Sequence, residues 1–223
     1  MASNSGDKGT RNLVIAMVVF IVAVGVIFSF ISSRSDSTAA IPAAVSESDG
    51  YGIVLNPTST PTIDVYIDYQ CPACRVFEII IGGYLNEVIA QKKAKVVYHP
   101  MTFIGPESIL AANAAACAAD EGEFVDMNLA LFQNQPQGEN SGKWQSEYFV
   151  ALGKSIGINS NTFEQCVNDG KYVNWTGNVA AASAKADVNG TPTIKINGKA
   201  LDRNTEYGDL GKFRAALAAG GVK

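Results

Sequence analysis

The longest apolar run of the chain comes first, at Leu13–Ile31, which holds nineteen residues without a charged side chain. A helix of that length spans roughly 29 Å, close to the hydrocarbon thickness of a bilayer. Lys8 and Arg11 precede the run, and Arg34 is the only nearby cation after it. The positive-inside rule therefore predicts a single-pass segment with residues 1–12 in the cytoplasm and the rest exported.

A cleaved secretory signal is the alternative interpretation of this run. Such signals have apolar cores of about 7–15 residues followed by small residues at the cleavage site. The run at 13–31 is longer, which favours a retained transmembrane anchor in the cell membrane, although small residues follow at Ala39–Ala44. Both interpretations place the body of the protein outside the cytoplasm.

After the apolar run the pattern predicts a linker and then alternating elements. Residues 32–50 are rich in Ser, Ala, Asp and Thr without apolar periodicity, which predicts a flexible linker. Runs of β-branched and aromatic residues predict three strands, and the intervening pattern predicts a helix over 72–90. The strands lie at residues 52–55, 62–69 and 95–99. Gly82-Gly83 inside the helix costs about 1 kcal/mol per Gly, which predicts a kink or break there.

The second half of the chain changes from helices to a hairpin. Residues 107–186 have a helical, Ala-rich pattern interrupted by a polar loop at 133–142, and Asn161 with Glu164 resembles a capping box. Two short strands at 193–196 and 199–201 flank Asn197-Gly198, a dipeptide typical of type I′ hairpin turns. A last helix is expected over about 205–219. The order is β-α-β, a helical insertion and β-β-α, which predicts an α/β protein with a parallel strand pair.

Composition and charge exclude several functional classes. Charged residues make up 17% of the 223 residues and apolar residues 47%, which excludes a disordered or highly charged tail protein. The formal net charge is −4 and no basic stripe is present, so nucleic acid is not an expected partner. A single histidine excludes a multi-histidine metal site.

The chemistry is concentrated in Cys71-Pro72-Ala73-Cys74, where a predicted strand meets a predicted helix. Free N–H groups and the positive end of the helix dipole stabilise a thiolate at the first cysteine. Cys71 is then a nucleophile and a good leaving group, and Cys74, one turn later, is the resolving thiol. A metal-binding pair is the first alternative, but zinc usually needs four ligands and no second such pair exists. A structural disulfide is the second. We expect no metal and no cofactor.

Three segments together resemble the DsbA-like branch of the thioredoxin superfamily, and most of all its membrane-anchored forms in Gram-positive actinobacteria. The segments are DYQCPAC, VVYHPMTFIG and VNGTPTIKINGKAL, and the resemblance covers roughly Ile53–Leu217. It implies a thioredoxin fold in two parts, 51–105 and 187–223, that flank a helical insertion domain at 106–186.

The resemblance also implies roles for individual residues. Cys71 matches the surface nucleophile and Cys74 its buried partner. Pro192 matches a cis-proline that faces the cysteines, and Thr191 matches the residue whose backbone pairs with an extended substrate. His99 matches a histidine near the end of a strand, where a packed structural role is favoured over a catalytic one.

The motif departs from the family at its centre. Strongly oxidising members have His between the cysteines, where this chain has Pro72-Ala73. Without that ring we expect a less depressed thiolate pKa and a less oxidising pair. The direction of electron flow therefore stays open at this point.

Four further side chains have two interpretations each. Cys117 and Cys166 are either buried free thiols or, outside the cytoplasm, a structural disulfide. A disulfide between them would close a loop of about 50 residues, which would stabilise the fold by roughly 4 kcal/mol. Asp68 and Glu78 flank the motif and are either proton relays to Cys74 or, more commonly for carboxylates, exposed.

The leading hypothesis is a monomeric oxidase that forms disulfides in exported polypeptides with free cysteines, reoxidised by a membrane redox partner linked to quinone. A reductase or isomerase with the same fold is the first alternative. A metal-delivery or peptide-binding module is the second, and it is poorly supported because only Met101 and Met127 could supply thioether ligands within the domain.

Overall fold

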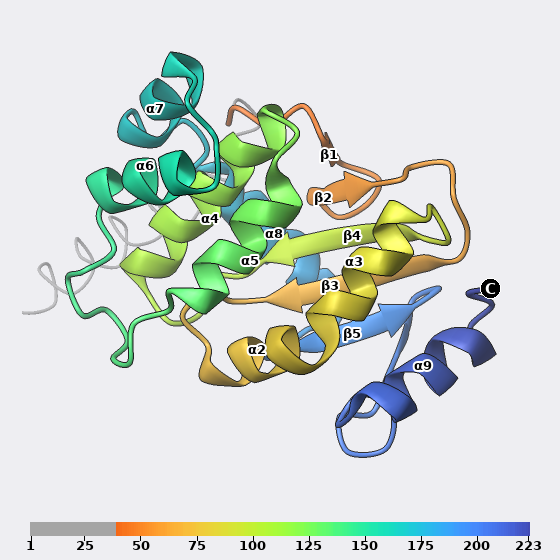
Figure 1. Cartoon of the computed structure of the whole chain (residues 1–223). Coiled ribbons are helices and arrows are strands. Elements are labelled where there is room, and N and C mark those ends of the chain that lie inside the picture. Colours follow the sequence, from red (N-terminus) through yellow and green to blue (C-terminus); the bar gives the residue numbers. More distant parts are fainter. Residues whose placement is uncertain (1–38) are drawn as a thin grey trace, which may run out of the picture. The chain divides into compact units, whose positions relative to one another are not determined.

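The computed structural model describes residues 39–223, which form one compact unit (Figure 1). The predicted tail at 1–12, the anchor at 13–31 and the first part of the linker lie outside the described residues. Within 39–223, no helix combines the length and apolarity that a membrane crossing requires.

Strands and helices alternate along the described chain. The strands are β1 (Val45–Ser46), β2 (Gly52–Leu55), β3 (Thr62–Ile67), β4 (Lys95–Pro100), β5 (Thr193–Ile196) and β6 (Lys199–Ala200). The helices are α2 (Pro72–Phe77), η1 (Glu78–Gly82), α3 (Gly83–Ala90), α4 (Pro106–Asp120), α5 (Phe124–Gln133), α6 (Ser146–Ser155), α7 (Asn161–Asn168), α8 (Trp175–Lys185) and α9 (Leu210–Ala219).

The sheet has the order β1-β2-β4-β3-β5-β6, and β3 with β4 is its parallel pair. The predicted α/β class and the parallel pairing are confirmed. β3 lies between β4 and β5, and its alternate residues Ile63, Val65 and Ile67 are buried. A strand with neighbours on both sides has few ways to move, so the chain that leaves its end is held in place by the sheet.

Helices cover both faces of the sheet (Figure 1). α2, η1 and α3 lie on one face with α9 beside them, and Phe77 meets Phe213 of α9 edge to face at 6.0 Å between ring centroids. α8 lies on the other face, against β4. The apolar sides of these helices and the sheet form one continuous core.

The helical region between β4 and β5 packs around α4. This helix is rich in alanine, and the small side chains let α5, α6 and α7 approach it closely. A disulfide joins Cys117 of α4 to Cys166 of α7 across 49 residues of sequence. Of the two interpretations of these cysteines, the structure therefore contains the bonded one.

The prediction of a flexible linker over 32–50 is wrong at its end. Val45–Ser46 form β1, which pairs with β2, and Ala44 and Val45 pack against the core. The Ala43 N–H donates to the Asp120 carboxylate at 2.9 Å. Composition could not reveal this order, because the partners that hold the segment come from β2 and α4.

The prediction of a kink or break at Gly82-Gly83 is wrong in part, because the helix does not break there. α2, η1 and α3 follow one another without a gap, and Gly82 and Gly83 have helical φ values of −54° and −57°. The irregularity is a π-helical turn at Glu78–Gly82. A Cβ at Gly82 would lie 2.4 Å from Oε1 of Glu78, so Gly82 makes room for a buried carboxyl group.

Two element starts differ from the sequence prediction. The Oγ of Ser160, one residue before the expected cap, accepts the Phe163 N–H at 3.0 Å. The last helix begins at Leu210 because Asp209 caps it, accepting the Lys212 N–H at 2.9 Å.

Two neighbouring glycines provide a matched test of this helix. Gly82→Ala should lower the free energy of unfolding by about 1–3 kcal/mol, because the new methyl group collides with Glu78. Gly83→Ala, with nothing within 4 Å of its Cβ, should raise it by about 0.5–1 kcal/mol through helix propensity. Urea unfolding of both variants measures the difference. Equal effects of the two substitutions would contradict this account of Gly82.

Candidate active site

Cys71 and Cys74 lie where the central strand gives way to its helix. Cys71 is the N-cap of α2, with extended φ and ψ of −73° and 118°, and Pro72 is the first helical residue. Proline suits that position because the N–H it lacks has no helical partner there. Both thiols are free, Cys71 half-buried and Cys74 fully buried.

The two thiols have opposite acidities. The pKa of Cys71 is lowered to about 5, chiefly by a hydrogen bond from the Cys74 thiol, against the opposing effect of burial. Thr191 and the backbone N–H groups of Ala73 and Cys74 lower it further. Burial raises the pKa of Cys74 far above its ordinary value, and the hydrogen bond to Cys71 adds to that effect. Near neutral pH the site therefore holds one accessible thiolate beside one buried thiol.

A loop from the second half of the chain faces the cysteines. The Thr191–Pro192 peptide bond is cis, the geometry that the family resemblance implied. The Thr191 carbonyl oxygen lies 3.6 Å from Sγ of Cys71. Residues 71–74 and 191–192, which are far apart in the sequence, are thus brought together.

Two residues that sequence reasoning missed hold this loop. The Tyr207 hydroxyl donates to the Pro192 carbonyl at 3.0 Å, and Nη2 of Arg203 donates to the Thr191 carbonyl at 3.2 Å. Both come from the connection between β6 and α9. No local pattern marks that connection, since only the tertiary fold places it against the cis-proline.

The helical region also holds the chain that leads into Cys71. Gln135 Nε2 donates to the carbonyls of Tyr69 and Cys71 at 2.7 and 3.0 Å. Gln70 Nε2 donates to Ser108 Oγ at 2.9 Å, and Ser108 Oγ donates to the Asp68 carboxylate at 2.7 Å. The insertion thereby fixes the backbone that presents the nucleophile.

The expectation that Asp68 and Glu78 are exposed is wrong. Asp68 is fully buried and accepts hydrogen bonds from Ser108, the Gln70 N–H and the Ile104 N–H. Burial raises its pKa, and these bonds oppose the rise.

Glu78 is the less well satisfied of the two carboxyl groups. It is 3% exposed, and its Oε1 has no hydrogen-bond partner among the described residues. Burial raises the pKa of Glu78 to about 7, against a hydrogen bond from Asn128. Glu78 follows Cys74 by one helical turn, so the two side chains leave the helix on the same face.

His99 belongs to a different environment. Its ring stacks on Tyr66 at 4.1 Å, and Nε2 lies 3.1 Å from the Asp64 carboxylate. Its other edge lies against Gly52, where a Cβ would be 2.9 Å from Nδ1. None of these partners is a cysteine, which favours the packed structural role over a catalytic one.

A groove of about 410 Å³ opens beside the motif. Its apolar floor includes Ala73 and Val76 of α2 and Ile80 of η1, and the connection before α9 also lines it. Val76 is 54% exposed and Ile80 40% exposed. Apolar side chains left open to water next to a nucleophile are typical of a surface that receives a partner. Elsewhere in residues 39–223, no three His, Cys, Asp or Glu side chains cluster closely enough to hold a metal ion.

Comparison with known proteins agrees with this geometry. Residues 49–213 match the model of a family described as Thioredoxin. The chain is 26% identical over 163 residues to disulfide bond formation protein D of Bacillus subtilis, covering 70% of this chain and 72% of that protein. MdbA, a thiol-disulfide oxidoreductase from Actinomyces oris, superposes with a TM-score of 0.69 at 22% identity, covering 84% of this chain and 98% of that one.

Other relatives are much longer. The chain is 28% identical over 168 residues to the Na(+)/H(+) antiporter NhaA 1 of Mycolicibacterium gilvum, covering 74% of this chain but only 25% of that protein. The chain thus spans about a quarter of the length of these antiporter relatives.

The acidity of Cys71 can be measured directly. In the reduced protein, the rate of alkylation by iodoacetamide should rise with pH through a midpoint near 5, because the thiolate is the reacting form. Cys74→Ala removes the hydrogen bond that contributes most to lowering the Cys71 pKa, so the midpoint should move upward. A midpoint near 9, the ordinary thiol value, would contradict the assigned electrostatics.

Glu78 should make stability depend on pH. Its pKa rises from 4.5 to about 7 on folding, so the folded state binds the proton more tightly than the unfolded chain. The unfolding free energy should therefore fall as pH rises from 4.5 to 7, by roughly 3 kcal/mol from this group.

Glu78→Gln isolates this effect. Denaturation of the parent and the variant is followed between pH 4.5 and 8 with the active-site cysteines oxidised, so that Cys71 does not titrate. The stability of the variant relative to the parent should increase with pH. A difference that stays constant over this range would show that Glu78 titrates like an exposed carboxyl.

Proposed function

Since the chain belongs to the thioredoxin family, we propose that it is a thiol–disulfide oxidoreductase of the DsbA type that forms disulfides in exported polypeptides. One observation carries the proposal, the unequal setting of two free cysteines one helical turn apart. Cys71 is half-buried with its pKa lowered to about 5, whereas Cys74 is buried with its pKa raised. The likeness to a disulfide bond formation protein supports the same activity.

The reaction begins with Cys71 and Cys74 joined in a disulfide. A substrate thiolate attacks Sγ of Cys71, the Cys71–Cys74 bond breaks, and Cys74 leaves and takes up a proton. A second substrate thiolate then attacks the substrate sulfur of the mixed disulfide, and Cys71 leaves as a thiolate. The substrate loses two electrons, the enzyme gains them, and the low pKa of Cys71 makes it the better leaving group.

The loop at Thr191–Pro192 positions the substrate in this scheme. It faces Cys71 with its carbonyl group 3.6 Å from the sulfur, so an extended peptide lying along Thr191 would present its cysteine to that sulfur. The neighbouring apolar groove receives side chains next to the reacting cysteine.

The acidity of Cys71 favours the oxidising direction. A pKa of about 5 lies between that of a strongly oxidising DsbA, about 3.5, and that of the reducing thioredoxin, about 7. A stabilised thiolate stabilises the reduced enzyme and makes its disulfide the stronger oxidant. We therefore place the chain on the oxidase side, with a milder potential than members that have His in the motif.

The location and partners are part of the same proposal. The apolar run at 13–31 anchors the chain in the cell membrane, with the N-terminus in the cytoplasm and the catalytic domain outside. The Cys117–Cys166 disulfide is consistent with an oxidising compartment. A membrane redox partner reoxidises Cys71–Cys74 after each turnover, and the enzyme acts as a monomer.

The proposal is tested by oxidative folding of a reduced, disulfide-containing protein. Cys71→Ser should lower the rate to that without enzyme, because the Cys71–Cys74 disulfide that accepts the two electrons can no longer form. Cys74→Ser should trap a mixed disulfide with insulin, because the resolving thiol is missing. Full activity of Cys71→Ser would refute the assignment.

The equilibrium reduction potential separates the two directions of electron flow. A value nearer −120 mV supports the oxidase, and one near −270 mV supports a reductase. It is measured on the purified protein in glutathione buffers of stated ratio.

A further inference from the structure

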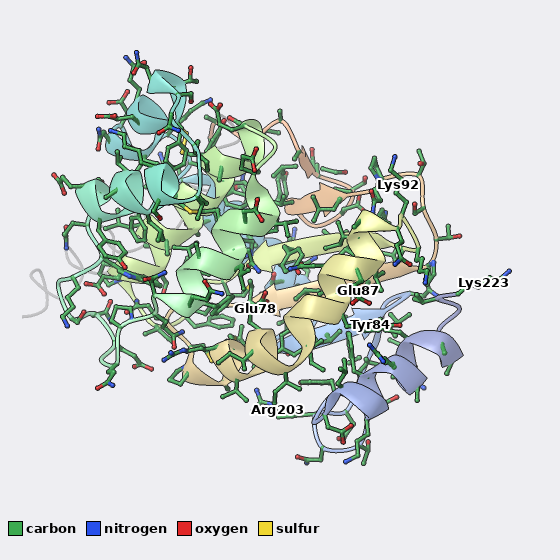
Figure 2. The ribbon with its side chains drawn as sticks, in the orientation of Figure 1. Glu78, Tyr84, Glu87, Lys92, Arg203 and Lys223 are labelled. Carbon is green, nitrogen blue, oxygen red and sulfur yellow. A yellow bond between two sulfur atoms is a disulfide. The ribbon has the colours of Figure 1, made fainter. Side chains whose placement is uncertain are left out.

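Two cations line the active-site groove, Arg203 and Lys212, and no anionic residue lines it. Lys212 is paired with the Asp209 carboxylate at 3.5 Å, and Asp202 and Glu206 lie in the same connection, so Arg203 is the cation of the lining without a carboxylate partner among the described residues. Arg203, labelled in Figure 2, lies in the connection between β6 and α9, and Lys212 lies on α9, whereas the apolar lining residues Val76 and Ile80 belong to α2 and η1.

Arg203 has binding capacity that the fold does not use. Its Nη2 donates to the Thr191 carbonyl, yet no carboxylate of residues 39–223 lies within 4 Å of its guanidinium group. A guanidinium group has five N–H donors in a fork that matches a carboxylate. Arg203 is exposed, so the remaining donors are available to a ligand.

The position of Arg203 places that capacity next to the reacting sulfur. The Thr191 carbonyl that accepts from Arg203 is the same one that lies 3.6 Å from Sγ of Cys71. Any polypeptide whose cysteine reaches Cys71 must therefore place a neighbouring residue near the guanidinium group. Lys212 is a second cation of the lining; its Nζ donates to the Asn204 carbonyl at 3.1 Å and lies 3.5 Å from the Asp209 carboxylate, an exposed pair that water screens.

The floor of the groove offers apolar contact. Val76 and Ile80 are exposed to water along the first helix and lie next to Ala73 of the motif. A partner that fits both sides has an apolar side chain on one side of its cysteine and an anionic side chain on the other.

We propose that Arg203 and Lys212 make this enzyme select polypeptides in which an acidic residue lies within one or two positions of the reacting cysteine, with an apolar residue on its other side. This inference rests on the proposed oxidase function and names its substrate class. A carboxylate attracted to the groove raises the rate of productive encounter, and the attraction weakens with salt.

The test uses the oxidised protein and three reduced dithiol peptides of equal length. In each, the first cysteine follows Val and precedes Glu, Gln or Lys. In the reaction the peptide dithiol becomes a disulfide and the Cys71–Cys74 disulfide becomes a dithiol. Samples are quenched with acid and alkylated, and mass spectrometry measures the fraction of peptide oxidised. Each rate is divided by that of the same peptide with a neutral aromatic disulfide, because a neighbouring carboxylate also changes the peptide's own thiol pKa.

At low ionic strength kcat/KM should fall from the Glu to the Gln to the Lys peptide, by about tenfold between the first and the last. In about 0.5 M salt the preference should shrink to less than about threefold. The double variant Arg203→Gln/Lys212→Gln should lose the preference, and Arg203→Glu/Lys212→Glu should invert it. An inversion cannot arise from loss of stability, since that would slow all three peptides alike.

The matched control removes two charges elsewhere. Lys92→Gln/Lys223→Gln has the same change in net charge at positions that lie away from Arg203 (Figure 2). It should keep the preference of the parent, whereas loss of the preference in this control would assign the effect to net charge and overturn the proposal. Equal rates for the three peptides would overturn this inference alone, and no oxidation of any peptide would overturn the proposed function.

Discussion

The chemistry of this fold depends on keeping two sulfur atoms, one helical turn apart, in different environments. Cys71 lies at the N-cap, where N–H groups without helical partners point toward it, and Cys74 lies inside the core. Their hydrogen bond lowers the pKa of one thiol and raises that of the other. If the helix began one residue later or the core admitted water, the lowering of the Cys71 pKa and the raising of the Cys74 pKa would both diminish. The sheet and the helical insertion matter to the chemistry mainly because they prevent that.

The insertion contributes more than surface to this arrangement. Gln135, at the end of α5, holds the carbonyls of Tyr69 and Cys71, and Ser108 of α4 connects Gln70 with the buried Asp68. These contacts fix the chain on the N-terminal side of the nucleophile, while Tyr207 and Arg203 fix the cis-proline loop across from it. The two segments that meet at the sulfur thus receive hydrogen bonds from different parts of the molecule, and the pairing of β3 with β5 joins the strands next to them.

The parts of this structure that sequence analysis predicted are those whose cause is local. The strand before Cys71, the Asn197-Gly198 hairpin with both residues at positive φ, and the helix that begins at Pro72 all follow from neighbouring residues. Errors arose where a distant partner decides the outcome. Val45 is in a strand because β2 pairs with it, and the Asp68 carboxylate is buried with hydrogen-bond partners from Ser108 and the Ile104 N–H. Arg203 has no motif around it, so only the folded chain reveals that it meets Thr191.

Although the motif lacks the histidine of strongly oxidising members, the pKa of Cys71 is still lowered, by another route. With Pro72-Ala73 between the cysteines, the largest contribution to the pKa of Cys71 comes from the Cys74 thiol and not from an intervening side chain. The acidity of the nucleophile then depends on keeping Cys74 protonated, and its burial does this. Since the thiol that stabilises the nucleophile is also the other half of the reactive disulfide, any change that exposes Cys74 alters both the acidity of Cys71 and the bond that the two sulfurs form. The core beneath the motif is therefore under chemical as well as structural constraint, which gives a reason for the tight packing around a sulfur that never meets solvent.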